Sequence, residues 1–288
     1  MRWVIAFGLP PGSLATAVIE RYLGPICVPS GGDCTGTDYK NYVDETPQDI
    51  LKDLGADASN TSCNLRNVSW VIPDGNWSDH PGEGSVDAGP SWVAAIVNAV
   101  GGYDNRGHRL LHQCSYWQNT VVLVTWDDWG GFYDDIAPPY AGYPNGKGRQ
   151  YVYGFRVPLI VVSAYAKPNY VSGACNGGPC SPASPFIHDF GSILDFVEYA
   201  FGSGGSRIGP GFGISGAPQL PYADYFAPDG PYVCAPTTCP YGLSDFFNFS
   251  QPPRTFTPIG GAAYQTDCFL NASTCLGFPQ DPDNDAVD

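Results

Sequence analysis

The chain of 288 residues carries a formal net charge of −15, from 13 basic and 28 acidic residues. This charge argues against binding to nucleic acid or to an anionic membrane surface, because both need a basic face on the protein. The 36 glycines and 28 prolines indicate a chain rich in loops and short elements, which excludes a coiled coil or a helical bundle.

Three apolar segments, at residues 67–73, 120–126 and 157–163, predict buried β-strands. Their apolar residues are continuous rather than alternating, which is typical of strands covered on both faces. Helical spacing predicts helices at 91–100 and 189–201, and each is followed by glycine. The order strand, helix, strand, strand, helix predicts an α/β fold with an open, largely parallel sheet.

Two adjacent carboxylates, Asp127 and Asp128, end the strand at 120–126 and precede Gly130-Gly131. Ligands bind beyond the carboxyl ends of strands in open α/β sheets, and paired oxygen ligands favour a divalent cation. Because neighbouring strand residues point to opposite faces, both can reach one ion only if the chain leaves the strand here. The alternative is a strand-end turn whose aspartates are solvated.

Histidines supply the other candidate site residues. His80 follows the first predicted strand, at the same rim of the sheet as Asp127, where it could face an anionic oxygen; the alternative is an inert loop histidine. Asp79 beside it is an accessory candidate. His188 precedes the last helix, where an accessory role competes with a position next to a helix cap.

Ten cysteines in an acidic chain indicate an oxidising compartment, so the protein is expected to be periplasmic or secreted. Disulfides are the preferred interpretation and a zinc site is the alternative. Residues 1–9 resemble the start of an export signal but are too short for one, which suggests that the true N-terminus is missing. No stretch of the sequence is long and apolar enough to span a membrane. The expected couples are Cys27/Cys34, Cys175/Cys180, Cys234/Cys239 and Cys268/Cys275, with Cys63 and Cys114 remaining as a fifth.

Several long blocks of this sequence resemble, in order, the bacterial phosphoesterase family that holds phospholipase C and acid phosphatase enzymes. The resemblance covers roughly residues 27–249. The blocks that carry it are Val68-Ser-Trp-Val-Ile-Pro73, Ser78-Asp-His-Pro81, residues 89–100, Val124-Thr-Trp-Asp-Asp-Trp-Gly-Gly-Phe-Tyr-Asp134, Tyr153-Gly-Phe-Arg-Val-Pro-Leu-Ile-Val-Val-Ser163, His188-Asp-Phe-Gly-Ser-Ile-Leu194 and Leu243-Ser-Asp-Phe-Phe-Asn-Phe249.

This resemblance implies an alkaline-phosphatase-like α/β/α sandwich and a metal-dependent hydrolase of phosphate esters. On the family pattern, Asp127 and Asp128 match paired acidic ligands of a divalent metal of unknown identity, and His80 matches the histidine that faces the phosphoryl group. Such a metal offsets phosphate charge, and such a histidine stabilises the other oxygens or the leaving group. The implied partner is a phosphate-ester substrate.

Two departures from the family pattern qualify the hypothesis. The upstream Glu-Asn metal motif and the Ser or Thr nucleophile are absent, so the chain is expected to represent a C-terminal portion. Asp135 stands where histidine is common. The alternatives are a non-catalytic disulfide-rich remnant or phospho-ligand binder and, more remotely, a sulfatase. The expected division is a divergent or truncated segment at 1–25, a phosphoesterase-like domain at 26–250, and a disulfide segment with an acidic tail at 251–288.

Overall fold

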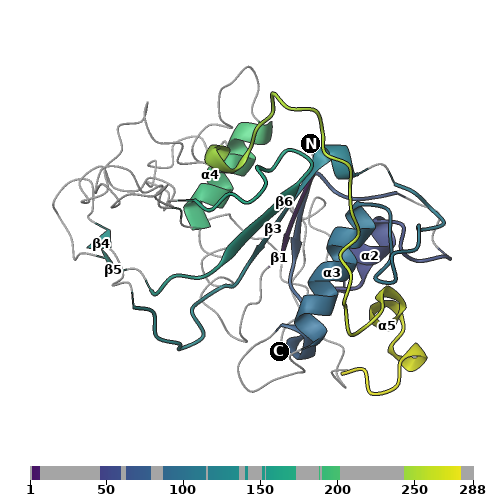
Figure 1. Ribbon diagram of the computed structural model, residues 1–288. Helices are drawn as coiled ribbons and strands as arrows, with labels where there is room; N and C mark the ends of the chain where they lie inside the picture. The colour runs from purple at the N-terminus through teal and green to yellow at the C-terminus, as the bar shows by residue number, and fades with distance from the viewer. Residues whose placement is uncertain are drawn as a thin grey trace, which may run out of the picture. The chain divides into compact units, whose positions relative to one another are not determined.

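The computed structural model describes part of the chain and shows an α/β fold (Figure 1). Its described residues fall into two compact units, which are presented one after the other. The first comprises residues 2–130, 157–162 and 255–288, and the second comprises residues 131–156 and 163–254. The residues described are 2–6, 46–59, 63–78, 87–114, 116–135, 140–141, 151–152, 154–172, 188, 190–201 and 243–279.

A four-stranded sheet with the order β2-β1-β3-β6 organises the first unit. The strands are β1 (Arg2–Ala6), β2 (Val68–Val71), β3 (Thr120–Thr125) and β6 (Leu159–Ser163). The three strands expected from apolar runs are therefore present, each shorter than its run. β1 was not expected; it pairs in parallel with β2 on one side and with β3 on the other.

The register of these pairings places two chain segments at one edge of the sheet. Ala6 is the partner of Val71 in β2 and of Val124 in β3. Strands lie about 4.8 Å apart, so the Cα atoms of Val71 and Val124 are about 10 Å from each other across β1. The loops that follow β2 and β3 therefore start at the same carboxyl edge, as the sequence pattern indicates.

Helix α3 (Ala88–Val100) connects β2 to β3 and packs against β3 (Figure 1). All its residues but Pro90 and Val93 are buried, which is typical of a helix covered on every side. The expected stop at Gly101-Gly102 is confirmed. Gly102 has φ +82° and lets the Tyr103 amide reach the Asn98 carbonyl at 2.9 Å, a pattern typical of glycine-terminated helices.

Helix α3 is covered by helix α2 (Asp49–Asp53) and by the C-terminal segment 255–279, which contains helix α5 (Thr266–Leu270). Buried Asn98 fastens this segment, because its side chain donates to the Ile259 carbonyl at 3.0 Å and accepts from the Ile259 amide at 2.7 Å. Trp92 and Trp77 of the 3₁₀ helix Gly75–Trp77 pack with Phe269 at centroid distances of 5.1–5.2 Å. This aromatic group belongs to the main hydrophobic core.

The second unit contains the two-stranded antiparallel pair β4 (Tyr140–Ala141) and β5 (Tyr151–Val152), helix α4 (Phe190–Phe201) and a 3₁₀ turn at Ser244–Phe246. Helix α4 confirms the helix expected at 189–201. Its Phe196 stacks on Phe247 with the ring centroids 5.0 Å apart. The expected division at residues 25 and 250 stays a prediction.

Two disulfides are present among the described residues, Cys63–Cys114 and Cys268–Cys275. Both match couples expected from the sequence, and no described cysteine is free. The other six cysteines, Cys27, Cys34, Cys175, Cys180, Cys234 and Cys239, lie outside the described residues. None of the described helices combines the length and apolar character needed to cross a membrane.

Candidate functional site

The chain leaves the strand conformation directly after β3, at Asp127 and Asp128. β3 is buried over all six residues, whereas Asp127 is half-buried and Asp128 is exposed. Gly130 and Gly131 have φ values of 61° and 77°, a region that favours glycine, so this tight turn depends on both. The departure from the strand is what two adjacent ligands of one ion require.

The Asp128 carboxylate is fixed by its own turn. Its Oδ1 atom accepts a hydrogen bond from the Gly130 amide at 2.5 Å. This contact orients the carboxylate at the carboxyl edge of the sheet, where a hard cation would find oxygen donors. Within the described part of the chain, neither Asp127 nor Asp128 belongs to a group of three metal-ligand side chains.

An ion pair follows the turn. Asp134 accepts two hydrogen bonds from the Arg156 guanidinium, from Nε at 2.6 Å and from Nη2 at 2.8 Å. Asp135 is a second, looser partner, with 3.7 Å between its Oδ1 and Arg156 Nη2. The hydrogen bonds to Asp134 raise the pKa of Arg156 above its usual value. Two segments of the family-like sequence, 124–134 and 153–163, are thereby joined.

His80 and Asp79 lie outside the described residues. The loop that leads to them is described as far as Ser78 and begins in a fixed conformation. Asp74 is buried and caps the 3₁₀ helix by accepting from the Asn76 amide at 2.8 Å, and the Trp77 indole donates to the Pro279 carbonyl at 3.0 Å. This loop leaves the same edge of the sheet as the Asp127-Asp128 turn.

His188 belongs to a buried polar cluster of the second unit. Its Nε2 atom lies 3.0 Å from Ser172 Oγ and 3.1 Å from Asp245 Oδ1. Asp245 Oδ2 also accepts from Ser172 Oγ at 2.7 Å and from the Tyr170 hydroxyl at 2.8 Å. Ser172, His188 and Asp245 do not form a catalytic triad, since serine and aspartate approach the same ring nitrogen.

The electrostatics of this cluster favour an ionised Asp245. Burial opposes ionisation, but hydrogen bonds from His188 and Ser172 and the charge of His188 outweigh it, so the pKa of Asp245 is lowered. Burial and the hydrogen bond to Asp245 raise the pKa of Tyr170 to about 12. The cluster therefore holds one carboxylate among several donors.

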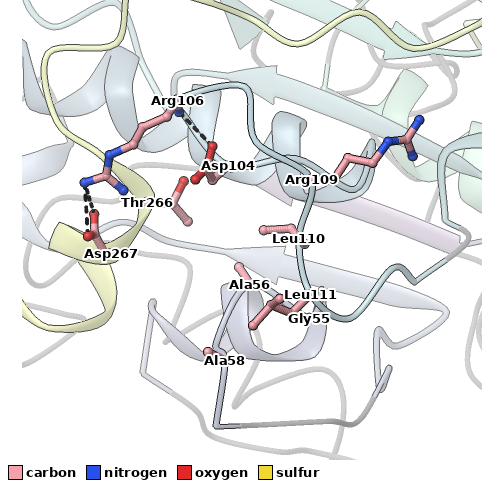
Figure 2. Close-up of a pocket in the computed structure, with 10 residues that line it drawn as sticks. All are labelled: Gly55, Ala56, Ala58, Asp104, Arg106, Arg109, Leu110, Leu111, Thr266 and Asp267. Atoms are coloured by element: carbon pink, nitrogen blue, oxygen red, sulfur yellow. Dashed lines mark hydrogen bonds and ion pairs between the residues drawn. The ribbon is translucent and has the colours of Figure 1, made fainter.

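Figure 2 shows a pocket of the first unit, between the end of α2, the loop after α3 and the start of α5. Arg106 spans it, with its backbone amide donating to Asp104 and its guanidinium to Asp267 at 3.1 and 3.2 Å. Residues 104–111 precede β3, whereas Asp127 follows it, so this pocket lies at the other end of the strand. The Arg106 guanidinium and the Asp267 carboxylate in this pocket are bound to each other, and the pocket contains none of the expected site residues.

The metal-like group Asp267, Cys268 and Cys275 is explained by structure. Its three ligand-type atoms lie within 4.8 Å of one another. Both cysteines form a disulfide, so their sulfur atoms are not available as thiolates. The zinc alternative therefore fails for this couple.

Sequence reasoning missed Arg156, Ser172 and Asp245 as members of polar clusters. Arg156 and Asp245 stand in the blocks 153–163 and 243–249, which were noted for resemblance and not for chemistry. A charged residue inside an otherwise apolar, proline-flanked block was the available signal for Arg156. No local pattern pointed to Ser172, because its partners are 16 and 73 residues away.

A family model described as the phosphoesterase family matches residues 37–203, more than half of the chain. The chain belongs to the phosphoesterase family. The matched segment includes the loop after β2, the Asp127-Asp128 turn and the whole of helix α4.

The curated relatives of this phosphoesterase carry phospholipase C names. Phospholipase C B of Mycobacterium tuberculosis is 31% identical over 169 residues, which are 52% of this chain and 27% of that protein. The non-hemolytic phospholipases C of Pseudomonas aeruginosa and Burkholderia pseudomallei are both 25% identical, over 170 and 205 residues. These matches cover 51% and 63% of this chain but 21% and 26% of those proteins. The chain thus spans about a quarter of the length of these relatives.

Proposed function

We propose that this chain carries part of the active site of a metal-dependent hydrolase of phosphate esters. The observation that carries the proposal is the Asp127-Asp128 turn, where two carboxylates follow a fully buried strand in a phosphoesterase-family chain. The whole fold is proposed to be the alkaline-phosphatase-like α/β/α sandwich. The parallel pairing of β1 with β2 and β3, and the packing of α3 against β3, support this proposal.

The residues present fit a divalent cation. Asp127 and Asp128 supply hard oxygen ligands, and the glycine turn frees the chain from the alternation of a strand. When bound, such a cation neutralises phosphate charge and lowers the pKa of an attacking group. Because only two carboxylates are proposed from this chain, we expect millimolar affinity or weaker for it alone. Calorimetry with Mn²⁺, Zn²⁺ and Ca²⁺ measures this affinity directly.

His80 is proposed to face the phosphoryl group from the neighbouring loop. The register of β2 and β3 on β1 supports this role, since both loops begin at one edge about 10 Å apart. There an imidazole N–H can donate to a phosphoryl oxygen that no cation contacts, or to the leaving group. Asp79 and His188 are proposed accessory residues; for His188 the described contacts support a stabilising role within the second unit.

The proposed substrate is a phosphate ester of the phospholipid type, because the relatives carry phospholipase C names. The net charge of −15 favours zwitterionic or soluble esters over anionic ones. The alternative to a phospholipid substrate is an acid-phosphatase-like activity on small phosphate esters. Disulfides between Cys63 and Cys114 and between Cys268 and Cys275 support an extracytoplasmic location.

Hydrolysis of a chromogenic phosphocholine ester tests the proposal, with the divalent metals above and with chelator. Because the family's nucleophile is absent from this sequence, we expect little or no turnover by the chain alone. Any turnover that is measured should require metal and should fall at least about 100-fold in Asp127→Asn and Asp128→Asn. Asp135→Asn, which removes the same charge from the same turn, is the matched control and should keep turnover within about threefold. Turnover that survives Asp127→Asn would contradict the assignment.

The non-catalytic alternative predicts a different result in the same assay. A chain that binds a phosphorylated ligand but never turns it over would show ligand binding by calorimetry and no product with any metal. Binding without product is a possible result for the 288-residue chain, because a group-transfer reaction cannot proceed without an attacking group. Ligand binding that needs no metal and survives Asp127→Asn, with no turnover, would replace the hydrolase proposal with this alternative.

A further inference from the structure

Three large aromatic side chains are exposed in the five residues that follow the paired aspartates. Trp129, Phe132 and Tyr133 are 40%, 69% and 83% exposed. We call residues 129–133 the aromatic turn. Elsewhere in the described chain, the exposed large apolar side chains stand singly along the sequence, and single exposed apolar residues are ordinary for a protein surface. Three of them in one short turn call for a functional explanation.

The aromatic turn is braced on both sides. Before it, the Gly130 amide donates to the Asp128 carboxylate; after it, Asp134 holds Arg156 through two hydrogen bonds. Tyr133 also packs edge-on against Phe155, with the ring centroids 5.5 Å apart. The rings are therefore presented by an ordered backbone, so less conformational entropy is lost on docking than with an unstructured loop.

The aromatic side chains of the turn and the acidic residues beside it indicate which kind of surface it would bind. Tryptophan and tyrosine, with an apolar body and a polar edge, concentrate at the interface between lipid and water. Among the described residues that follow the turn, the first basic one is Arg156, and it is bound by Asp134 and Asp135. With four aspartates at 127, 128, 134 and 135 flanking the turn, an anionic lipid surface is repelled and a zwitterionic one is not.

We propose that the aromatic turn docks the protein on a zwitterionic phospholipid surface, with Phe132 and Tyr133 entering the headgroup region. This inference rests on the proposed function and adds to it the surface through which the chain would meet aggregated lipid. Phe132 lies four residues after Asp128, so at most about 14 Å of chain separates the docked ring from the carboxylates. Docking through this turn thus brings lipid phosphate toward the proposed metal ligands.

Binding to vesicles tests the docking role without requiring turnover. The full chain is mixed with phosphatidylcholine vesicles in the presence of chelator, and bound protein is measured by flotation and by the blue shift of tryptophan fluorescence. Phe132→Ser/Tyr133→Ser should weaken vesicle binding at least about tenfold, because two aromatic rings lose their burial in the headgroup region. Leu276→Ser removes an exposed apolar side chain outside the turn and should leave binding unchanged.

Further measurements distinguish a failure of the docking role from a failure of the proposed function. Adding phosphatidylglycerol to the vesicles should weaken binding, and tighter binding would overturn the choice of a zwitterionic surface. The double variant should keep hydrolysis of the soluble ester within about twofold, and Phe132→Ser alone keeps the Tyr133–Phe155 contact as a folding control. Vesicle binding unchanged by both variants, or absent from the parent chain, overturns the docking role. Vesicle binding together with ester hydrolysis that needs no metal, or that survives Asp127→Asn, overturns only the proposed function.

Discussion

Asp134 and Arg156 form a two-bonded ion pair across 22 positions of sequence. Asp134 is largely buried, whereas the Arg156 side chain is two-thirds exposed, so solvent screens part of the attraction. The Nε and Nη2 groups of Arg156 donate in parallel to the two carboxylate oxygens of Asp134, so the pair depends on the planar guanidinium and not simply on its positive charge. In the sequence, Asp134 follows the proposed metal ligands Asp127 and Asp128 by seven and six residues.

The first prediction concerns this pair. Arg156→Lys keeps the charge but loses one of the two parallel hydrogen bonds, so it should behave more like Arg156→Gln than like the parent. A double-mutant cycle of Asp134→Asn and Arg156→Gln should give a coupling free energy of about 1 kcal/mol, as for well-formed surface pairs. Urea unfolding measures it. A coupling near zero would mean that the pair has no stabilising role in solution.

The second prediction concerns pH and the buried carboxylate Asp245. Because its pKa in the folded protein lies below the ordinary 3.8, its contribution to stability is fully present above that pH and is lost as pH falls through the lower folded value. The free energy of unfolding should therefore drop below about pH 4 in the parent and drop less steeply in Asp245→Asn. Asp267→Asn, an exposed carboxylate, is the control and should reproduce the parental curve.

The third prediction compares the two disulfides. Cys63–Cys114 joins residues 51 positions apart, whereas Cys268–Cys275 joins residues seven apart. In the chain-entropy model, the longer loop contributes about 4 kcal/mol and the shorter about 2.5 kcal/mol. Paired serine substitutions should therefore lower the urea midpoint more at 63 and 114 than at 268 and 275. The reverse order would show that strain or residual denatured-state structure, and not loop length, controls the difference.

The fourth prediction concerns the close approach of Gly101 to Phe256. A Cβ atom on Gly101 would lie 2.2 Å from two carbons of the Phe256 ring, which also packs edge-on against Trp117. Gly101→Ala should cost about 1–3 kcal/mol of stability through overpacking. Gly260→Ala has open space and should be nearly neutral.

The same Gly101 substitution in a Phe256→Leu variant tests whether the contact with the Phe256 ring is the cause of the stability loss. Phe256→Leu removes the ring carbons that the new Cβ would meet, so Gly101→Ala should cost less there than in the parent. Thermal unfolding of the four proteins measures this coupling. Equal costs in both backgrounds would locate the effect of Gly101→Ala in the helix end and not in the contact with Phe256.

The elements with strong local patterns were predictable. β3 has six consecutive buried residues, five of them β-branched and one leucine, and α3 is followed by Gly101-Gly102, of which Gly102 adopts a positive φ. The paired aspartates followed from the position of β3. These features depend on residues close in sequence, where apolar runs and turn chemistry are informative.

The remaining features depend on partners that sequence spacing does not reveal. β1 is five residues long, in an apolar run that ends soon at Pro10, and its strand character comes from pairing with residues more than 60 positions away. Arg156 and Ser172 likewise acquire their roles from distant carboxylates. Charged and hydroxyl side chains at isolated positions have too many solvated alternatives for their partners to be inferred.

The position of β1 between β2 and β3 has a consequence for the protein's solubility. Within the described sheet, β2 and β3 each bond to β1 and do not pair with each other. Removing residues 2–6 would uncover two rows of backbone donors and acceptors on apolar strands, and such rows recruit other chains. A chain trimmed by those few residues should therefore self-associate through its exposed strand edges instead of persisting as a loosened monomer.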